Sequence, residues 1–449
     1  MQRNIYIENM PLEQARQIYI DRLKECGYFK MESEVIDVLE SQGRITSSAV
    51  FARRSSPHYA AAAMDGIAVK ASSTFEASEI TPVTLPPGTF IEVDTGDYVP
   101  REFDAVIMIE DVNFIDSAAR VIKAAVPWQH IRSVGEDLVA HDMVIPSSYQ
   151  IGPYEVASLC TAAVPSVEVV KKPLVAIIPT GTELIDEGSD DMSPGEIVES
   201  NSRMLSGLSQ EWGAATYRHK IVPDDKNLLR QAVEEVKDKA DMIIICSGSS
   251  AGREDYTSSI IEEFGEVLVH GIATRPGKPA ILGVIGNKPV IGVPGYPISA
   301  GLIFNLFARP VLYMKQGITP PQADILECNV SRKIASSMGV DEYIYTNIAK
   351  IDNHYIAYPL NRGAGITTSL VKADGAFCIK RGNEGLEAGE PCKVELHRPR
   401  SIIDNTIVMI GSHDMTIDFL VDILQRQYGI RLVSTHVGSV GGIVALRRG

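Results

Sequence analysis

Three short apolar segments of this chain each run directly into a loop of small residues. They are 174–178 before Pro-Thr-Gly-Thr-Glu, 242–246 before Ser-Gly-Ser-Ser-Ala-Gly, and 290–293 before Pro-Gly-Tyr-Pro. Small residues after a strand let backbone N–H groups approach a phosphate or another oxyanion. Each loop alone is better explained as an ordinary connection between a strand and a helix, because Gly is common there. Three such loops together favour a ligand site.

Charged side chains of both signs lie near these loops in the sequence. They are Glu183, Arg253, Glu254, Asp255, Arg275 and Lys278. The stiff segment Arg275-Pro276-Gly277-Lys278-Pro279 would present two cations to an anionic ligand with little loss of side-chain entropy. Carboxylates beside a phosphate site are typical ligands of Mg²⁺. A solvated loop with incidental ion pairs explains the same residues equally well.

Other Asp-Gly and Gly-rich segments are first interpreted as turns. They are Met64-Asp65-Gly66, Asp94-Thr95-Gly96-Asp97, and the stretch from Asn361 to Gly375 that contains Ser369. Asp and Asn before Gly are typical turn residues, so their types and spacing alone assign them no chemistry.

The segments that must position these loops alternate between strand and helix from 172 to 316. Expected helices begin at Asn201 and span 226–239, and a further strand is expected over 216–222. This order and the continuous apolar runs predict a parallel sheet covered on both faces.

The flanking regions have a different character. Helices are expected over 12–26 and 151–160, and a second helical stretch from Glu34 to Leu39. Strands at 66–69, 90–93 and 105–109, separated by Pro and Gly, predict a β-rich lobe. Residues 320–399 are also predicted to be β-rich.

The last residues, 402–449, predict about one βαβ unit and the start of another helix. Expected strands are 406–410 and 431–434, with a helix capped by Ser412 or Asp414 between them. A unit near ~40 residues rarely folds unaided. It therefore either docks on the main body or belongs to a domain that is incomplete here.

Composition narrows the class of protein. The chain has 449 residues, 45% of them hydrophobic, and a formal net charge of −15. These values predict several globular domains and argue against nucleic acid or an anionic membrane as partners. The six cysteines form no C-x-x-C pair, which favours free thiols in the cytoplasm. The start MQRNIYIENM lacks the pattern of a signal peptide, and the apolar stretch 290–314 is too interrupted by Pro, Asn and Arg for a membrane span.

The motifs, taken in order, resemble the molybdopterin molybdenumtransferase family, the MoeA proteins and the gephyrin E domain, over about residues 12–399. In the β-rich lobe, Ala63–Gly66 is similar to the family's AMDGYA, and Asp94–Gly96 with Asp104–Val106 and Glu110 is similar to TGA…ADAVV…E. In the α/β region, Pro179–Leu184 is similar to P-T-G-x-E-L, Ser247–Thr257 to SGGVSVGxxDYT, Arg275–Pro279 to R-PGKP, and Pro294–Pro297 to PGNP. Further on, Gly363–Asp374 is similar to GSGxLxSLxxADG. Asn201 matches the family's Asn before a helix. The chain departs from the family at Ile67, Asp97, Tyr296 and in the 247–257 loop, which is one residue shorter.

The resemblance implies an α/β multidomain fold and a homodimer. The expected parts are an N-terminal linker segment (1–60), a β-rich lobe (61–128), the return of the linker lobe (129–171), a parallel-sheet molybdopterin-binding domain (172–318), a β-barrel (319–400) and a partial βαβ segment (401–449). The last of these resembles the opening of a periplasmic-binding or LysR-effector domain. There Ser412, His413, Thr435 and Gly438 would border ligand loops.

The resemblance also implies a reaction: adenylyl-molybdopterin and molybdate give molybdenum cofactor and AMP, with Mg²⁺. The residues implied as catalytic are Asp65, Glu183, Asp255 and Lys278, with Glu183 and Asp255 as metal ligands. Those implied to bind substrate are Thr95, Thr180, Gly181, Ser247, Gly248, Ser250, Arg275, Pro294, Pro297 and Ser369. Asp65 and Thr95 would come from the other protomer, and Pro294 and Pro297 would shape the pterin or molybdate pocket.

Three alternatives stay open at the level of sequence. Tungstate has nearly the size and charge of molybdate, and no residue separates the two. The shortened 247–257 loop and the C-terminal segment suit a non-catalytic binding or regulatory protein. A gephyrin-like scaffold has only fold analogy behind it.

Overall fold

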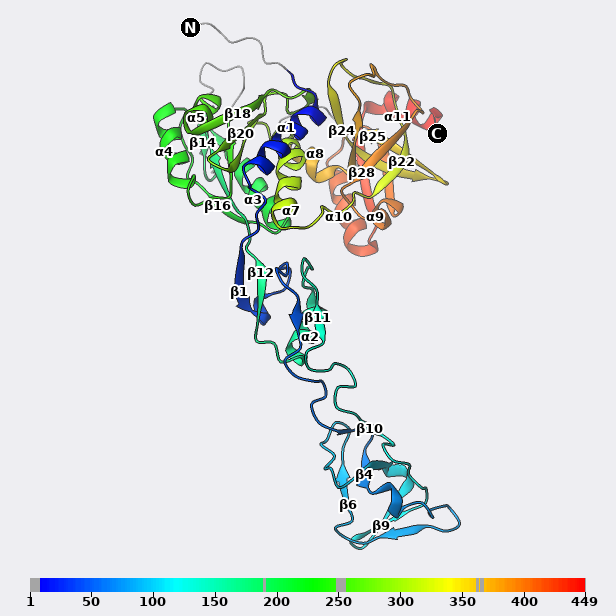
Figure 1. Cartoon of the computed structure of the whole chain (residues 1–449). Helices are drawn as coiled ribbons and strands as arrows, with labels where there is room; N and C mark the ends of the chain where they lie inside the picture. The colour runs from blue at the N-terminus through cyan, green and yellow to red at the C-terminus, as the bar shows by residue number, and fades with distance from the viewer. Residues whose placement is uncertain (1–8, 189–190, 248–255, 361–362, 364–366, 449) are drawn as a thin grey trace. The chain divides into compact units, whose positions relative to one another are not determined.

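A computed structural model describes residues 9–188, 191–247, 256–360, 363 and 367–448. The chain divides into two compact units, Met31–Lys171 and a unit made of Met1–Lys30 with Lys172–Gly449 (Figure 1). Each is described below by itself.

The first unit begins and ends with one strand pair. β1 (Ser33–Asp37) runs antiparallel to β12 (Ser166–Val170), and β2 (Val50–Phe51) pairs with β11 (Met143–Ile145). The helix α2 (Pro153–Thr161) confirms the expected helix there. The helix expected from Glu34 to Leu39 is wrong, because that segment forms β1 and the 3₁₀ turn η1 (Val38–Glu40). The long-range pairing with β12 outweighs local helical preference.

The β-rich lobe of this unit is built from two three-stranded antiparallel sheets. One has the order β6 (Phe90–Val93), β4 (Gly66–Val69), β7 (Ala105–Met108), and the other β5 (Val83–Leu85), β9 (Ala118–Val121), β8 (Val112–Ile115). Strands β3 (Ala61–Ala62) and β10 (Ile131–Arg132) form a small pair beside them. The predicted strands 66–69 and 90–93 are confirmed with the same bounds, and 105–109 with one residue fewer. All of β4 is buried because it is the central strand.

The second unit contains a six-stranded sheet. Its order is β16 (Ala215–Arg218), β13 (Leu174–Pro179), β17 (Met242–Cys246), β21 (Lys288–Val293), β20 (Ile281–Ile285), β18 (Gly265–His270). The first four strands are parallel, as predicted, although β16 is shorter than expected. Strand β20 runs antiparallel to both of its neighbours, β21 and β18, which the expectation of a purely parallel sheet missed. A two-residue turn at Gly286-Asn287 joins β20 to β21 and forces this reversal.

Helices cover both faces of this sheet, as the apolar strands predict. One face packs against α1 (Leu12–Glu25), α3 (Asn201–Glu211), α6 (Pro297–Ile303) and α7 (Arg309–Lys315), through buried Tyr19, Leu205 and Phe304. The other packs against α4 (Lys226–Val236) and α5 (Thr257–Phe264), through Val233 and Ile260. β13, β17 and β21 lie between these layers, so their carboxyl ends are rigidly placed.

The longest apolar helical run lies over residues 297–315. Helices α6 and α7 are joined by the π-helical turn η4 (Phe304–Ala308), and together they are long and apolar enough to cross a membrane. However, 56% of the most apolar 18-residue stretch within Pro297–Lys315 is buried inside the protein. The Phe304 ring stacks on Trp212 with centroids 5.1 Å apart, so this run is a core helix of the sheet layer.

The region after the sheet is a closed five-stranded barrel. Its strands, in spatial order, are β24 (Asp341–Ile351), β25 (His354–Pro359), β22 (Ile325–Val330), β28 (Pro391–Leu396) and β26 (Gly375–Ile379), and β26 pairs back to β24. The pair β23 (Ile334–Ala335) with β27 (Gly385–Leu386), and the helices α8 (Thr367–Lys372) and α9 (Arg400–Asp404), flank the barrel. Strand β19 (Thr274–Arg275) pairs in parallel with β24 and joins the barrel to the sheet domain.

The C-terminal segment, residues 401–449, follows the predicted order. β29 (Thr406–Gly411) and β30 (Arg431–His436) are parallel neighbours, with α10 (Thr416–Tyr428) between them and α11 (Gly438–Arg448) after them. The Asp414 carboxylate accepts a hydrogen bond from the Thr416 N–H, which confirms one of the two predicted caps. Arg431 forms an ion pair with Asp374 of the barrel, so the segment docks on the main body.

The closest backbone approach in the β-rich lobe predicts a sharp effect of substitution at Gly66. A Cβ there would lie 1.9 Å from the carbonyl oxygen of Ile107. We expect Gly66→Ala to destabilise this lobe by about 3 kcal/mol, because backbone cannot move aside as a side chain can. Hydrogen–deuterium exchange of peptides from β4, β6 and β7 measures the effect.

The matched control is Gly207→Ala in the helix α3, where an added Cβ meets nothing within 4 Å. It should leave exchange in the lobe unchanged. Unaltered protection of β4 in Gly66→Ala would contradict the close approach.

Candidate active site

The carboxyl ends of β13, β17 and β21 are tied together by hydrogen bonds. The backbone N–H and the Oγ1 hydroxyl of Thr180 both donate to the Cys246 carbonyl, at 3.0 and 2.8 Å. The Ser247 N–H donates to the Val293 carbonyl at 3.1 Å. Three of the loops predicted from the sequence therefore start from one edge of the sheet, as expected for a parallel sheet.

The loop after β13 has a backbone that only Gly suits. Gly181 has φ +153°, and an added Cβ would lie 2.9 and 3.0 Å from the two carboxylate oxygens of Glu183. The Gly181 N–H donates to the Val222 carbonyl, and the Ile197 N–H donates to the carbonyl of Glu183. Glu183 is thus fixed beside the strand end with an exposed carboxylate.

A cavity of about 670 Å³ opens at these strand ends. It is lined by Thr180, Glu183, Leu184, Ile197, Val198, Glu199, Ser200, Asn201, Cys246, Pro279, Pro294, Gly295, Tyr296, Pro297, Ser299 and Thr367. Strands β14 (Leu184–Ile185) and β15 (Ile197–Val198) form one wall. The Asn201 Nδ2 donates to the Gly295 carbonyl at 2.6 Å, which holds the loop between Pro294 and Pro297 against this wall.

A buried acid borders the same cavity. Glu199 is 3% exposed, and its carboxylate accepts hydrogen bonds from the N–H and hydroxyl of Ser202. The Arg218 guanidinium donates to Glu199 at 3.2 Å, to Ser202 at 2.6 Å, and to Asp186. Burial of Glu199 is therefore matched by a cation and by hydrogen bonds to its carboxylate.

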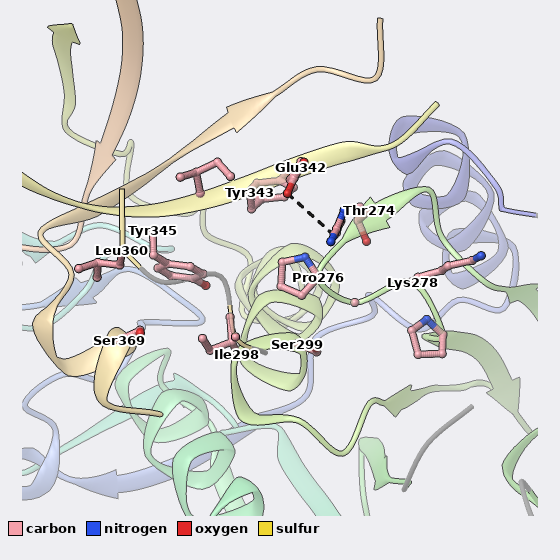
Figure 2. A pocket seen from close by; sticks show the side chains of 15 residues that line it. Thr274, Pro276, Lys278, Ile298, Ser299, Glu342, Tyr343, Tyr345, Leu360 and Ser369 are labelled. Atoms are coloured by element: carbon pink, nitrogen blue, oxygen red, sulfur yellow. Dashed lines mark ion pairs between the residues drawn. The ribbon is translucent and has the colours of Figure 1, made fainter. Parts of the chain in front are cut away.

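A second cavity, of about 310 Å³, lies between the sheet domain and the barrel (Figure 2). It is lined by Thr274, Arg275, Pro276, Gly277, Lys278, Pro279, Ile298, Ser299, Glu342, Tyr343, Ile344, Tyr345, Leu360, Gly363 and Ser369. Figure 2 shows Pro276 and Lys278 on the loop after β19, and Tyr343 and Tyr345 on β24. The two cavities share Pro279 and Ser299, so they adjoin.

The cations of the smaller cavity are held differently. The Arg275 Nε lies 3.9 Å from Glu342, the pair drawn as a dashed line in Figure 2, and its Nη1 donates to the Ser337 hydroxyl at 3.3 Å. Glu342 is buried and also accepts a hydrogen bond from Ser336 at 2.7 Å. Lys278 is exposed and has no carboxylate partner in the part of the chain that the structure describes. It is thus available to an anionic ligand.

The backbone at Gly277 and the barrel wall complete this cavity. Gly277 has φ +102°, and an added Cβ would lie 2.8 Å from the side chain of Ile303. Burial raises the pKa of Tyr345 to about 12, so its phenol stays protonated at neutral pH. Ser369 on α8 is 6% exposed and faces the same space. The cavity therefore offers hydroxyl donors and a free cation on a partly apolar wall.

The structure brings seven of the predicted residues together around the adjoining cavities. They are Thr180, Glu183, Pro294 and Pro297 at the larger one, and Arg275, Lys278 and Ser369 at the smaller one. Gly181 and Ser247 lie next in sequence to the lining residues Thr180 and Cys246. Gly248, Ser250 and Asp255 lie outside the described residues.

Asp65 and Thr95 belong to the other compact unit, Met31–Lys171. One carboxylate oxygen of Asp65 accepts hydrogen bonds from the Thr95 hydroxyl at 2.7 Å and from the Thr95 N–H at 2.6 Å. These two bonds, the hydroxyl first, hold the pKa of Asp65 below its ordinary value. The two predicted residues therefore form one exposed, ionised cluster on the β-rich lobe.

Several lining residues escaped the sequence analysis. Glu199 follows the short strand β15, and its position before the helix α3 was the available signal. Glu342 and Tyr345 had no local signal, because only the pairing of β24 with β19 brings them to the loop at 275–279. Ser299 lies two residues after the predicted motif Pro294–Pro297, so it was the easiest of these residues to predict from the sequence.

A metal at this site would need ligands besides the side chains that the structure describes. Among the described residues, no three His, Cys, Asp or Glu side chains form a group that could hold an ion by themselves. Glu183 is a carboxylate at the edge of a roomy cavity, which suits a cation that also takes ligand phosphates and water.

Comparison with known proteins covers most of the chain. Three family models match: the MoeA N-terminal region (domains I and II) over residues 10–163, a probable molybdopterin-binding domain over 176–313, and the MoeA C-terminal region (domain IV) over 328–397. The C-terminal segment lies beyond all three.

Individual relatives agree with these models. A Methanocaldococcus jannaschii protein, provisionally named for molybdopterin biosynthesis, is 33% identical over 86% of this chain and 98% of its own length. The molybdopterin molybdenumtransferases of Bacillus subtilis and Haemophilus influenzae are 27% and 24% identical, each over 86% of this chain and at least 96% of their own.

Two solved structures of the molybdopterin biosynthesis MoeA protein of Pyrococcus horikoshii each cover 87% of this chain and 100% of their own. Their TM-scores are 0.70 and 0.62, at 31% and 27% identity. The matched family models, the relative above 30% identity and the shared architecture place this chain in the MoeA family, the molybdopterin molybdenumtransferases.

Proposed function

We propose that this protein inserts molybdenum into the molybdenum cofactor. In the proposed reaction, the two dithiolene thiols of adenylyl-molybdopterin form Mo–S bonds and displace one molybdate oxygen, which leaves as water, and water cleaves the phosphoanhydride bond so that AMP leaves. The observation that carries the proposal is the pair of adjoining cavities, one at the strand ends and one at the loop bearing Arg275 and Lys278.

The two cavities suit the two reactants by size and charge. The smaller one, of about 310 Å³, holds the free ammonium of Lys278, a guanidinium and the Ser369 hydroxyl, which are suitable donors to a small dianion such as molybdate. The larger one, of about 670 Å³, has room for a pterin and phosphates at the strand ends. Because Pro279 and Ser299 border both, an oxyanion in one would adjoin the pterin in the other.

The Glu183 carboxylate at the larger cavity fits a magnesium ion that would aid this reaction. Glu183 and Asp255 would hold it, together with phosphate oxygens of the substrate. When bound, the ion would neutralise phosphate charge as the anhydride breaks. Glu199 is saturated by Arg218 and Ser202, so it shapes the wall and is not proposed as a ligand.

We further propose a cytoplasmic homodimer in which a second copy of the chain supplies Asp65 and Thr95. The cluster they form is exposed and already ionised, so it is suited to approach a cation or a polar group of the substrate. No nucleic acid or membrane takes part in the proposed reaction.

The first experiment quantifies AMP release from adenylyl-molybdopterin and Mg²⁺ on addition of molybdate. We expect molybdate-dependent release by the parent protein. In Lys278→Ala the molybdate concentration for half-maximal release should rise roughly ten- to hundredfold, because one charged hydrogen bond is lost.

Lys239→Ala is the control, since it removes an exposed lysine of the same domain away from both cavities. Its molybdate concentration for half-maximal AMP release should stay within roughly twofold of the parent value. Retention of the nucleotide without any release would identify a binding protein instead. Release that tungstate supports as well would widen the substrate class.

Removing the carboxylate of Glu183 should weaken the dependence on magnesium. In Glu183→Gln, an isosteric change, we expect the Mg²⁺ concentration for half-maximal AMP release to rise at least about tenfold, since a carboxamide is a poorer ligand for a hard cation. Glu187→Gln, an exposed acid four residues later, is the control. An identical Mg²⁺ titration for both variants would remove Glu183 from the metal site.

At a molybdate concentration too low for Lys278→Ala to act, mixing two variants that are each nearly inactive tests whether each site needs two copies. Asp65→Ala and Lys278→Ala, co-expressed with different tags, should recover about a quarter of the parental activity, because half of the dimers are mixed and each has one intact site. If one copy supplied both residues, the mixed dimers would recover nothing.

A further inference from the structure

The C-terminal segment, which lies beyond the family models, is anchored to the barrel through Arg431. The guanidinium forms an ion pair with Asp374 and donates a hydrogen bond through Nη2 to the Lys372 carbonyl at 2.9 Å. Its side chain is 15% exposed, so the contact is largely shielded from water. Shielding makes such a pair sensitive to the loss of one member.

Asp374 is a fully buried carboxylate at the junction of α8 and the barrel. Its second oxygen accepts a hydrogen bond from the Ile348 N–H of β24 at 2.8 Å, and the Arg398 Nε lies 3.6 Å from its first oxygen. Burial raises the pKa of Asp374, against the effect of these partners. The carboxylate thus links β24, the end of the barrel and the C-terminal segment.

The two arginines also hold the last turn of α8. Arg398 donates to the Val371 carbonyl, and Arg431 to the Lys372 carbonyl. Carbonyls at a helix C-terminus lack partners within the helix, and cations there are favourable. α8 has six residues, too few to be stable without such contacts.

α8 carries side chains into both cavities. Ser369 lines the smaller cavity and Thr367 the larger one. The helix also lies against α6 and β24, which form other walls of the same space. The position of its C-terminal turn therefore determines where these two side chains lie.

We propose that Arg431 is a positioning residue of the reaction site: the C-terminal segment fixes α8 through Arg431, and α8 in turn places Ser369 and Thr367. The structural part stands on the contacts above, and the kinetic consequence rests on the proposed function. Arg431 itself touches neither cavity that we assign to substrate.

The test compares Arg431→Ala with Arg426→Ala in the full-length protein. Arg426 is an exposed cation on α10 of the same segment, so its loss changes net charge equally without touching the barrel. Hydrogen–deuterium exchange of peptides covering 367–374 reports on α8. We expect about tenfold faster exchange there in Arg431→Ala only, with β13 and β17 peptides unchanged.

Kinetics of AMP release provide the second readout. In Arg431→Ala, kcat should fall about tenfold while the molybdate KM rises by no more than about threefold, because only Ser369 of the three proposed molybdate donors lies on α8. Arg431→Lys, which keeps the charge but not the forked donors, should fall between the parent and Arg431→Ala in both readouts.

Unchanged exchange at 367–374 would overturn the proposal, and so would faster exchange with unaltered kcat. If Arg431→Ala loses protection throughout the chain, Arg431→Lys decides by the same two criteria. A parent protein that releases no AMP would refute the proposed function, whereas the exchange result would still decide whether Arg431 fixes α8.

Discussion

The candidate site depends on one short backbone pairing, that of β19 with β24. Thr274 and Arg275 lie in register with Asp341 and Glu342, and the Asp341 N–H donates to the Ala273 carbonyl at 2.8 Å. This pairing brings the barrel wall to the loop that carries the two cations. The lining of the smaller cavity is divided between the two domains, so this pairing helps to determine how its two walls meet. Main-chain hydrogen bonds therefore help to set the geometry of this cavity, because they restrict movement of the barrel wall relative to the loop at 275–279 more than side-chain contacts do.

This acidic chain forms a cationic pocket because the buried acids next to the cavities are paired with nearby cations and hydroxyl groups. The formal net charge is −15, yet the two buried acids that border the cavities are paired: Glu342 with Ser336 and Arg275, and Glu199 with Ser202 and Arg218. A buried acid that is already bonded adds little repulsion toward an incoming anion, since its charge is balanced within a few ångströms. The ammonium of Lys278 then dominates the local field. Net charge excluded nonspecific polyanions as partners, but it does not describe this pocket.

Sequence reasoning succeeded where the determinants are local. The strands before 179, 247 and 294 and the turn residues after them were predictable, because a buried parallel strand and its loop are encoded in one short stretch. The strand β1 was missed because its partner β12 is more than a hundred residues away, and the antiparallel β18 and β20 because a parallel pattern was extended too far. Glu342 and Tyr345 reach the site through the pairing of β24 with β19, which no local pattern encodes. Motif resemblance joined Ser369, which lies in a stretch first interpreted as turns, to Arg275 and Lys278, which the residue types had already marked as two cations for an anionic ligand.

The attachment of the C-terminal segment follows the same electrostatic logic. Asp374 lies in the Ala-Asp-Gly stretch that the family model covers, and Arg398 and the Ile348 N–H already stabilise its charge. Burial nevertheless raises the pKa of Asp374 against these partners, so the barrel offsets only part of the cost of burying that charge, and the guanidinium of Arg431 adds attraction without a new buried anion. The segment beyond the family's last matched residue is thus joined to the barrel at a carboxylate that gains from a further cation. Because the joining point is also the end of α8, whatever moves the segment would act on the two side chains that α8 carries into the cavities.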